Sequence, residues 1–180
     1  GKVFEDEKFS IHVCKANHSV PAFSYLFEEK DKPGRFNLDK ANKLGIPEGK
    51  LWSDLQKGQD ITINDKTIKP DQVLGEKRQG KKIGISGDTM PTVELEKFFE
   101  NCDYLVFDST FLEEEKDRAQ ETCHSTAKQA ATLGKNAKVK NLVLTHFSAR
   151  YKNEEGHLKE AKEIHDSGIT AKDLLEVEIK

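Results

Sequence analysis

The chain has 180 residues, which is enough for one domain with its own core and too short for two comfortable ones. Hydrophobic residues make up 35% of it and charged residues 34%, the composition of a polar, soluble globular protein. Its net charge of −3 gives no general attraction to nucleic acid, so such binding would need local basic patches. No apolar run approaches the roughly 20 residues of a membrane helix and no signal peptide is recognisable, so we expect no membrane partner.

The three cysteines, Cys14, Cys102 and Cys123, are scattered along the chain and form no Cys-x-x-Cys pair. This usage predicts reduced thiols and a cytoplasmic protein, with each cysteine serving as a small, mostly buried side chain. The chain starts at Gly1, and the residues from Phe4 onward already have the pattern of a strand. We therefore expect the chain to be an internal part of a longer protein.

The first strand is predicted over residues 8–15, where Phe9, Ile11 and Val13 alternate on one face. The chain then passes through His18 into a second predicted strand, residues 23–28. A histidine between two strands is more often a hydrogen-bonded structural residue than a metal ligand. Taken alone, His18 leaves both interpretations open.

Residues 30–58 differ in composition, with two turn-rich segments and recurring basic residues. They also predict a short helix over residues 38–44, which Asn37 can cap. The simpler interpretation is a solvated insertion with a small satellite core, and composition favours it. The functional interpretation is an arm that grips a polyanion, with basic groups on phosphates and with Phe36 and Trp52 available for stacking.

Residues 61–63 and 67–68 flank Asn64-Asp65 and predict a small hairpin. A basic loop over residues 77–82 follows, directly before the central strand. Such a loop is usually only a solvated turn, but here it would lie beside the candidate site.

From residue 82 onward, strands and helices alternate, which predicts an α/β fold. The predicted strands are residues 82–86, 104–107, 142–144 and a closing strand over 175–179. The predicted helices begin at Pro91, cover residues 127–134 after a Ser125 or Thr126 cap, and cover residues 154–167 before Gly168.

Three successive apolar strands lead to a polar residue, namely Asp88, Asp108 and His146. In layered α/β folds the carboxyl ends of parallel strands meet at one rim, so we expect these side chains to lie together. Imidazole and carboxylate are zinc ligands, and a carboxylate such as Asp88 can bridge two ions. We predict that His18, Asp88 and His146 belong to a metal centre that needs further ligands from elsewhere. The remaining histidines are predicted to be structural: His12, His157 and His165.

His124 follows an acidic segment, residues 113–117, that we expect to be a flexible loop, and it precedes a predicted helix. A histidine that donates a proton to a leaving alkoxide needs a carboxylate to hold its tautomer. Asp108 is the candidate for that carboxylate.

Several motifs in this order and at this spacing resemble ribonuclease Z, a tRNA 3′-end processing endonuclease family of the metallo-β-lactamase fold. These motifs are Asn17-His18-Ser19-Val20-Pro21, Ser86-Gly87-Asp88-Thr89, His124-Ser125-Thr126 and Leu144-Thr145-His146-Phe147-Ser148-Ala149-Arg150-Tyr151. The likeness runs from about Ile11 to Lys180 and includes Lys32-Pro33-Gly34 and Leu44-Gly45-Ile46-Pro47, which resemble the family's tRNA-gripping arm.

The resemblance implies the C-terminal αβ half of a four-layer αβ/βα sandwich. Residues 1–180 would then form one partial domain, with a tRNA-binding arm inserted at residues 30–58. It makes His18 and His146 zinc ligands, Asp88 the bridging ligand, and His124 the histidine that assists the leaving group. Asp108 takes the place of the glutamate in the family's His-Glu-Ala-Thr motif. The substrate-binding residues it implies are Arg150, Lys32, Arg35, Lys50, Lys77 and Arg78.

The chain departs from the family pattern in three places. Asp108 is one methylene shorter than glutamate, which bears on its contact with His124. The segment after Gly45 lacks the family's Gly-Pro pair. The His-x-His-x-Asp-His motif, which would supply most other ligands and the aspartate that activates water, is absent and belongs upstream of Gly1.

The resemblance implies a zinc-dependent endoribonuclease that removes the 3′ trailer from precursor tRNA by attack of metal-activated water on a phosphodiester. The complete site would hold two Zn²⁺ ions, the protein would be a cytoplasmic homodimer without a DNA partner, and this chain by itself would be inactive. One alternative is a non-catalytic tRNA-binding or partner-dependent fragment that lacks the complete metal site. Another is a different hydrolase of the same fold.

Overall fold

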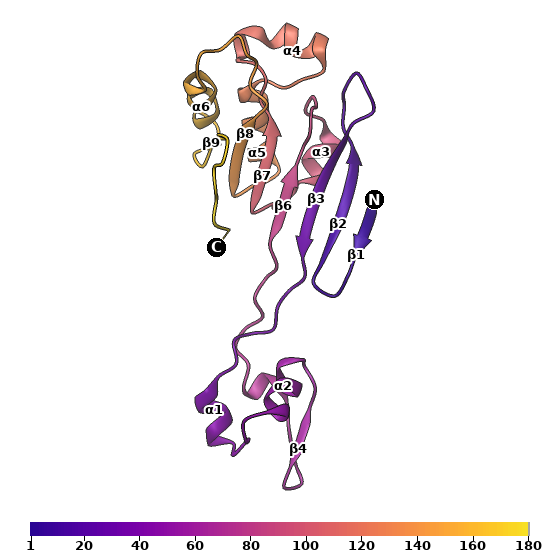
Figure 1. Ribbon diagram of the computed structural model, residues 1–180, viewed down its shortest axis with the longest axis vertical. Coiled ribbons are helices and arrows are strands. Elements are labelled where there is room, and N and C mark those ends of the chain that lie inside the picture. The colour runs from indigo at the N-terminus through magenta and orange to yellow at the C-terminus, as the bar shows by residue number, and fades with distance from the viewer. Residues whose placement is uncertain (180) are drawn as a thin grey trace. The chain divides into compact units, whose positions relative to one another are not determined.

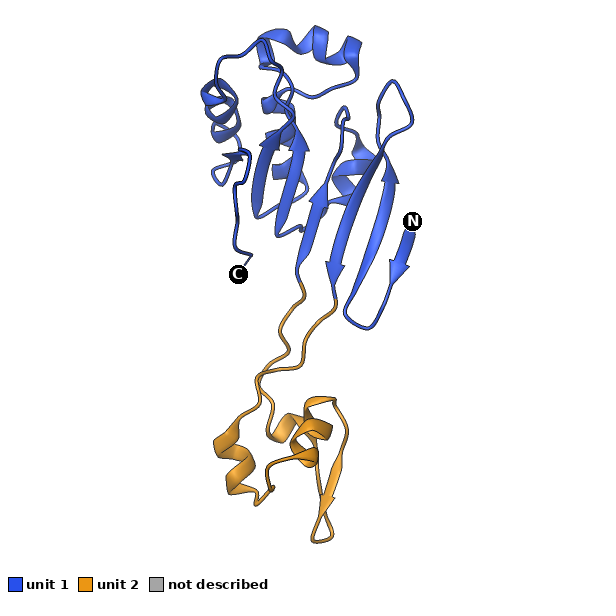
Figure 2. Ribbon diagram, viewed as in Figure 1, with its two compact units in different colours: residues 1–29, 81–180 blue, residues 30–80 orange. Residues whose placement is uncertain are grey.

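The computed structural model describes residues 1–179 (Figure 1), which fall into two compact units (Figure 2). Unit 1 combines residues 1–29 with the chain from Lys81 onward, and unit 2 consists of Lys30–Gly80. The predicted arm, residues 30–58, makes up the first part of unit 2, and the compact unit continues to Gly80. The arm's functional boundaries stay a prediction.

Unit 1 is built on one sheet that has seven strands within the described residues, in the order β1-β2-β3-β6-β7-β8-β9. These strands are β1 Lys2–Glu5, β2 Phe9–Lys15, β3 Phe23–Glu29, β6 Lys82–Ile85, β7 Tyr104–Asp108, β8 Asn141–Thr145 and β9 Ile169–Thr170. Neighbouring strands from β1 to β6 are antiparallel, and those from β6 to β9 are parallel. The parallel part needs helical crossovers, and the alternating strand and helix signals predicted them.

The helices of unit 1 include α3, α5 and α6, which contribute to a single core against one face of the sheet (Figure 1). The helices are α3 Val93–Phe98, α4 Lys116–Thr122, α5 Ala127–Asn136 and α6 Glu155–Lys162, with a 3₁₀ turn η2 over Glu113–Glu115. Fully buried Ala130 and Ala131 of α5 belong to this core together with Phe107 and Leu144 of the central strands. Small alanine side chains let this helix approach the sheet closely. Thr126 caps the helix by accepting from the Gln129 backbone N–H at 3.1 Å.

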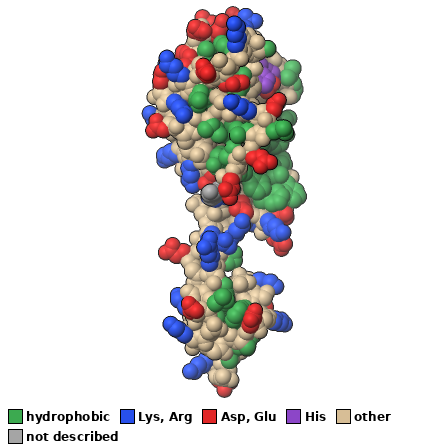
Figure 3. All heavy atoms as spheres, turned by 60° about the vertical axis from the view of Figure 1, so that its left-hand side comes forward, with side chains coloured by type: hydrophobic (Ala, Val, Ile, Leu, Met, Phe, Trp, Pro, Cys, Tyr) green, Lys and Arg blue, Asp and Glu red, His purple; other side chains and the backbone are tan. Residues whose placement is uncertain are grey.

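The other face of the sheet is apolar but largely bare. Because successive side chains of a strand point to opposite faces, Leu26 enters the core while Phe23 and Tyr25 remain 51% and 47% exposed. Ile85 on the neighbouring strand is 50% exposed. Figure 3 shows hydrophobic side chains gathered on one side of unit 1.

Unit 2 folds around a small core of its own. It contains α1 Leu38–Lys43, α2 Lys50–Gln56, the hairpin of β4 Ile61–Ile63 with β5 Lys66–Ile68, and the 3₁₀ turn η1 Pro70–Gln72. Phe36 and Trp52 pack against this core with ring centroids 5.2 Å apart, and the Trp52 indole N–H donates to the Ile46 carbonyl at 3.0 Å. Their rings therefore support the satellite core while remaining partly exposed, and their availability for base stacking stays a prediction.

Five local expectations are corrected. The acidic segment 113–117 is not a flexible loop, because it forms η2 and the first turn of α4. Helix α2 falls in a segment that had only turn signals. Helix α3 begins at Val93 rather than Pro91 because the Thr92 hydroxyl caps it, accepting from the Leu95 N–H at 3.1 Å.

The fourth correction concerns the closing strand predicted over residues 175–179, which is not a strand. The short strand β9 already occupies the position beside β8, so this segment finds no neighbouring strand to pair with. Its alternating side chains instead line a hollow with Tyr104 and Val106 on the bare face of the sheet. Helix α6 also ends earlier than predicted, at Lys162.

Candidate metal centre and proton-donor site

The candidate site lies at the rim of unit 1 where the parallel strands end. Asp88 follows β6, Asp108 is the last residue of β7, and His146 follows β8, so parallel pairing places all three at one edge of the sheet. His18 comes from the connection between β2 and β3, and His124 from the connection between α4 and α5. The sheet rim thus collects side chains that are far apart in the sequence.

The ligand-type atoms of these residues are close enough to share metal ions. His18, Asp88 and His124 each offer an atom within 4.8 Å of the others, and Asp108, His124 and His146 do the same. His146 Nε2 lies 3.4 Å from Asp88 Oδ2. The His124 ring centroid lies 4.9 Å from that of His18 and 4.9 Å from that of His146, so His124 stands between them.

Asp108 is fully buried and surrounded by donors. Its Oδ2 accepts from the Thr89 backbone N–H at 3.0 Å and pairs with His124 Nδ1 at 2.7 Å. Its Oδ1 accepts from the backbone N–H and the hydroxyl of Thr110, at 3.0 and 2.7 Å. The shorter aspartate therefore does reach His124. An ionised carboxylate only accepts hydrogen bonds, so it holds His124 with the proton on Nδ1.

The other histidines of the site also bond through Nδ1. His18 Nδ1 lies 3.1 Å from the backbone carbonyl of Cys123, which can only accept, so Nδ1 of His18 carries the proton. His146 Nδ1 lies 2.8 Å from the Thr110 hydroxyl. Cys123 and His146 both adopt left-handed backbone conformations, with φ of 58° and 64°. Such strain in residues with side chains is typical of functional sites.

These donors fit a metal centre. In the neutral tautomer with the proton on Nδ1, His18 and His146 keep the Nε2 lone pair for a metal ion, and Asp88 lies beside them with a half-exposed carboxylate. Imidazole nitrogen with carboxylate oxygen is the donor set of zinc sites. Distances alone do not distinguish His124 from the predicted metal ligands, because His124 belongs to both groups of neighbouring donor atoms. It differs from His18 and His146 in that its partner is a buried carboxylate, Asp108.

Arg150, predicted from the resemblance to contact RNA, is held in place beside this rim. Its guanidinium pairs with Glu115 Oε2 at 2.9 Å, and its Cζ lies 5.1 Å from the centroid of the Phe111 ring. Sequence reasoning missed Glu115 and Phe111, and nothing in their local pattern distinguished them. It also gave no role to Thr110, and none to Thr89, although Thr89 stands inside the Ser86-Gly87-Asp88-Thr89 motif. Cys123 was expected only to pack, whereas its carbonyl bonds to His18.

The remaining predicted substrate-binding residues lie on unit 2. Lys32, Arg35, Lys50, Lys77 and Arg78 are all exposed there. Lys32 and Lys77 line a hollow of about 440 Å³ together with Lys57, which sequence reasoning did not name. Arg78 also donates from Nε to the Pro33 carbonyl at 3.2 Å, which fixes its stem.

The histidines predicted to be structural lie outside the cluster. His165 Nε2 bonds to the Val139 carbonyl at 3.0 Å, and His12 pairs with Glu28 at 3.5 Å. His157 is fully buried against the rings of Phe147 and Tyr151, with centroid distances of 4.9 and 4.7 Å. Burial lowers its pKa from the ordinary value of 6.5 and outweighs the Thr110 backbone and the Glu154 charge, which act in the opposite direction.

The cysteines are free thiols, as their spacing predicted. Burial of Cys102 raises the pKa of its thiol to about 12, so this group is inert at neutral pH.

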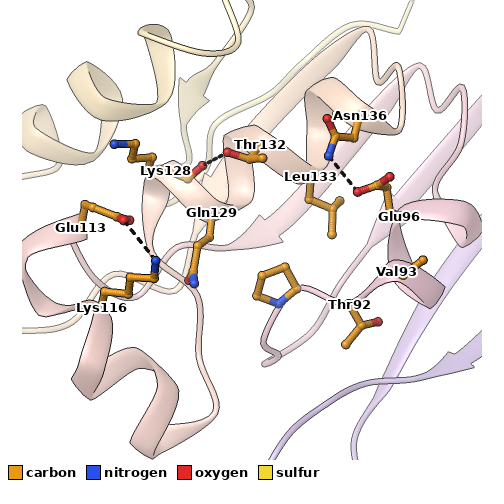
Figure 4. Close-up of a pocket in the computed structure, with 11 residues that line it drawn as sticks. Thr92, Val93, Glu96, Glu113, Lys116, Lys128, Gln129, Thr132, Leu133 and Asn136 are labelled. Carbon is orange, nitrogen blue, oxygen red and sulfur yellow. Dashed lines mark hydrogen bonds and ion pairs between the residues drawn. The ribbon is translucent and has the colours of Figure 1, made fainter.

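A second hollow, of about 390 Å³, lies among α3, η2 and α5 (Figure 4). Its polar side chains pair with each other: Asn136 donates to Glu96 at 3.0 Å, and Glu113 lies 3.8 Å from Lys116. These pairs leave no set of groups converging on a ligand, so the histidine cluster remains the better candidate.

Solved structures similar to this chain define its class, the metallo-β-lactamase fold. The metallo-β-lactamase fold protein YhfI from Bacillus subtilis is 15% identical, with a TM-score of 0.59 over 94% of this chain and 48% of that one. Human tRNase Z, short form, is 24% identical, with a TM-score of 0.62 over 99% of this chain and 46% of that one. The predicted α/β class and fold are therefore confirmed.

Within this class, the sequence comparison finds similarity to ribonuclease Z. The chain is 79% identical to a ribonuclease Z from Nitrosopumilus maritimus over 179 residues, which are 99% of this chain and 60% of that protein. It is 41% identical to one from Methanosarcina acetivorans, covering 59% of that protein. No family model matches the chain. The resemblance is confirmed, for a chain that spans about 60% of the length of these relatives.

Helices able to cross a membrane are absent from the part of the chain that the structure describes.

Proposed function

We propose that this chain is part of an endoribonuclease that removes the 3′ trailer from precursor tRNA. The observation that carries the proposal is the buried pair of His124 and Asp108, standing beside a group of metal-type donors. The identity of 79% to a ribonuclease Z supports the same assignment.

Within this proposal His18, Asp88 and His146 hold metal ions, two Zn²⁺ in the complete site, with the missing ligands supplied by the rest of the protein. When bound, such ions activate water and neutralise charge that develops on a phosphodiester. The chain's own contribution is to present the Nε2 lone pairs of His18 and His146 beside the Asp88 carboxylate on a rigid sheet rim.

His124 is proposed to protonate the leaving 3′-oxygen of the tRNA, so that the tRNA ends in a 3′-hydroxyl and the phosphate stays on the trailer. Its Nδ1 proton is held by Asp108, so a second proton on Nε2 makes an imidazolium that the buried carboxylate stabilises. The His124 side chain is 14% exposed, so Nε2 can reach a substrate while Asp108 stays out of water. A positioned acid of this kind contributes about 10²- to 10⁴-fold to the rate.

Precursor tRNA is the proposed substrate and partner. Arg150 is proposed to bind the RNA backbone, and the basic side chains Lys32, Arg35, Lys50, Lys77 and Arg78 of unit 2 are proposed to bind phosphates. The guanidinium of Arg150 suits this task because Glu115 and Phe111 restrict it before RNA arrives.

The rest of the protein is proposed to cover the bare face of the sheet and to complete the metal site. The exposure of Phe23, Tyr25 and Ile85 supports such a cover. We further propose that the protein works in the cytoplasm as a homodimer.

The test uses the complete protein that contains this chain, with a precursor tRNA carrying a labelled 3′ trailer. We expect cleavage at the 3′ end of the mature tRNA, bound zinc, and loss of cleavage on chelation. His12→Gln serves as the matched histidine control outside the cluster. A protein that binds precursor tRNA without cleaving it would overturn the proposal and favour the non-catalytic binding fragment. Hydrolysis of small esters or lactams, with precursor tRNA left uncut, would favour another hydrolase of this fold.

A further inference from the structure

Thr110 lies between the two functional parts of the site. It follows Asp108 by two residues where β7 ends, and it is 6% exposed. Its hydroxyl oxygen is 2.7 Å from Asp108 Oδ1 and 2.8 Å from His146 Nδ1. The same carboxylate, through its other oxygen, holds His124.

Proton accounting fixes the direction of these hydrogen bonds. A hydroxyl has one proton, and an ionised carboxylate can only accept, so Thr110 donates to Asp108. The Thr110 oxygen is then an acceptor toward His146, whose Nδ1 must carry the proton. The neutral His146 ring therefore keeps its lone pair on Nε2, the atom 3.4 Å from Asp88 Oδ2.

The backbone of Thr110 holds the same loop. Its carbonyl accepts from the Ser148 N–H at 3.1 Å, and the Ser109 N–H donates to the Thr145 carbonyl at 2.9 Å. The residues they hold, Thr145 and Ser148, lie on either side of His146, whose φ of 64° is unfavourable for a residue with a side chain. The residues around Thr110 thus hold the loop while its hydroxyl orients the ring.

We propose that Thr110 is a positioning residue that selects the metal-binding tautomer of His146 and couples it to the Asp108–His124 pair. One hydroxyl thereby links a metal ligand to the proton donor. This inference rests on the proposed function in that His146 is taken to be a metal ligand. Partners of this kind for metal-bound histidines typically contribute about 10- to 100-fold to metal affinity.

The test compares Thr110→Val and Thr110→Ser in the complete protein. Valine keeps the shape and removes the hydroxyl, whereas serine keeps the hydroxyl. Ser109→Ala is the matched control, because Ser109 is a buried neighbour whose hydroxyl bonds to the Phe107 carbonyl at 3.1 Å. The readouts are the tautomer of His146, from ring ¹⁵N NMR of metal-free protein with His146→Gln for assignment, and zinc affinity by competition with a chromophoric chelator.

We expect Thr110→Val to lose the Nδ1–H tautomer of His146 and to bind zinc about 10- to 100-fold more weakly, with Thr110→Ser and Ser109→Ala like the wild type. If Thr110→Val does not fold, Thr110→Ala takes its place. An unchanged tautomer and zinc affinity in the folded variant would overturn the inference. A wild type that binds no zinc, with the tautomer still lost in Thr110→Val, would overturn the proposed function and leave the positioning role of Thr110 standing.

Discussion

His124 and Asp108 are joined by a hydrogen bond of 2.7 Å between Nδ1 and Oδ2, with the carboxylate fully buried and the imidazole partly exposed. This contact holds the imidazole ring through Nδ1 and leaves Nε2 available to a substrate. It makes the role of His124 open to a direct kinetic test.

Replacing His124 with alanine should slow cleavage of precursor tRNA by about 10²- to 10⁴-fold, because the leaving oxygen loses its proton donor. Binding of tRNA and zinc content should change little, since His124 is assigned neither task. Single-turnover kinetics, a binding assay and metal analysis measure these quantities. A loss of one zinc per subunit in this variant would make His124 a metal ligand instead of an acid.

Replacing Asp108 with asparagine should impair both stability and activity. The amide weakens the charge-assisted bonds from the Thr89 and Thr110 N–H groups and no longer selects the tautomer of His124. We expect the free energy of unfolding to fall by about 1–3 kcal/mol, and cleavage to slow by about 10²-fold or more. Urea titration and the cleavage assay check this, with Asp103→Asn as a second aspartate at the opposite end of β7. Equal cleavage by the Asp108 variant and the wild type would contradict the assignment.

Replacing Arg150 with alanine should weaken tRNA binding without changing the zinc content. If Arg150 contacts one phosphate, the slope of log affinity against log salt should fall by about 1. Filter binding across a salt series measures this slope. Lys135→Ala on the exposed surface of α5 removes the same charge elsewhere and should leave the slope unchanged. Identical slopes for Arg150→Ala and wild type would remove Arg150 from the RNA contacts.

The buried His157 should make the protein less stable in mild acid. Its pKa in the folded state lies below the ordinary 6.5, so the unfolded chain binds more protons as the pH falls. The stabilising effect of the neutral ring is complete above pH 6.5 and is lost as the pH drops below that value. Urea midpoints at pH 7.5 and 5.5 should therefore differ more for wild type than for His157→Gln. A pH dependence that survives the substitution unchanged would contradict this.

Most of the local structure could be predicted from the amino-acid sequence. Apolar alternation located β2 and β3, Asn37 and Thr126 marked helix starts, and Asn64-Asp65 marked the hairpin turn, where both residues have positive φ. It also located the rim residues Asp88, Asp108 and His146, because parallel strands share one end. These features follow from short-range rules of backbone geometry and burial.

Contacts between side chains that are far apart in the sequence could not be predicted in this way, because they depend on the folded arrangement of the strands and helices. The bond from Thr110 to His146 joins residues 36 apart, and the bond from His18 to Cys123 joins residues 105 apart. Residues 175–179 have no strand partner because β9 already pairs with β8, and this too is a relationship between distant segments. Such relationships depend on strand order and helix packing, which the periodicity of one segment does not contain.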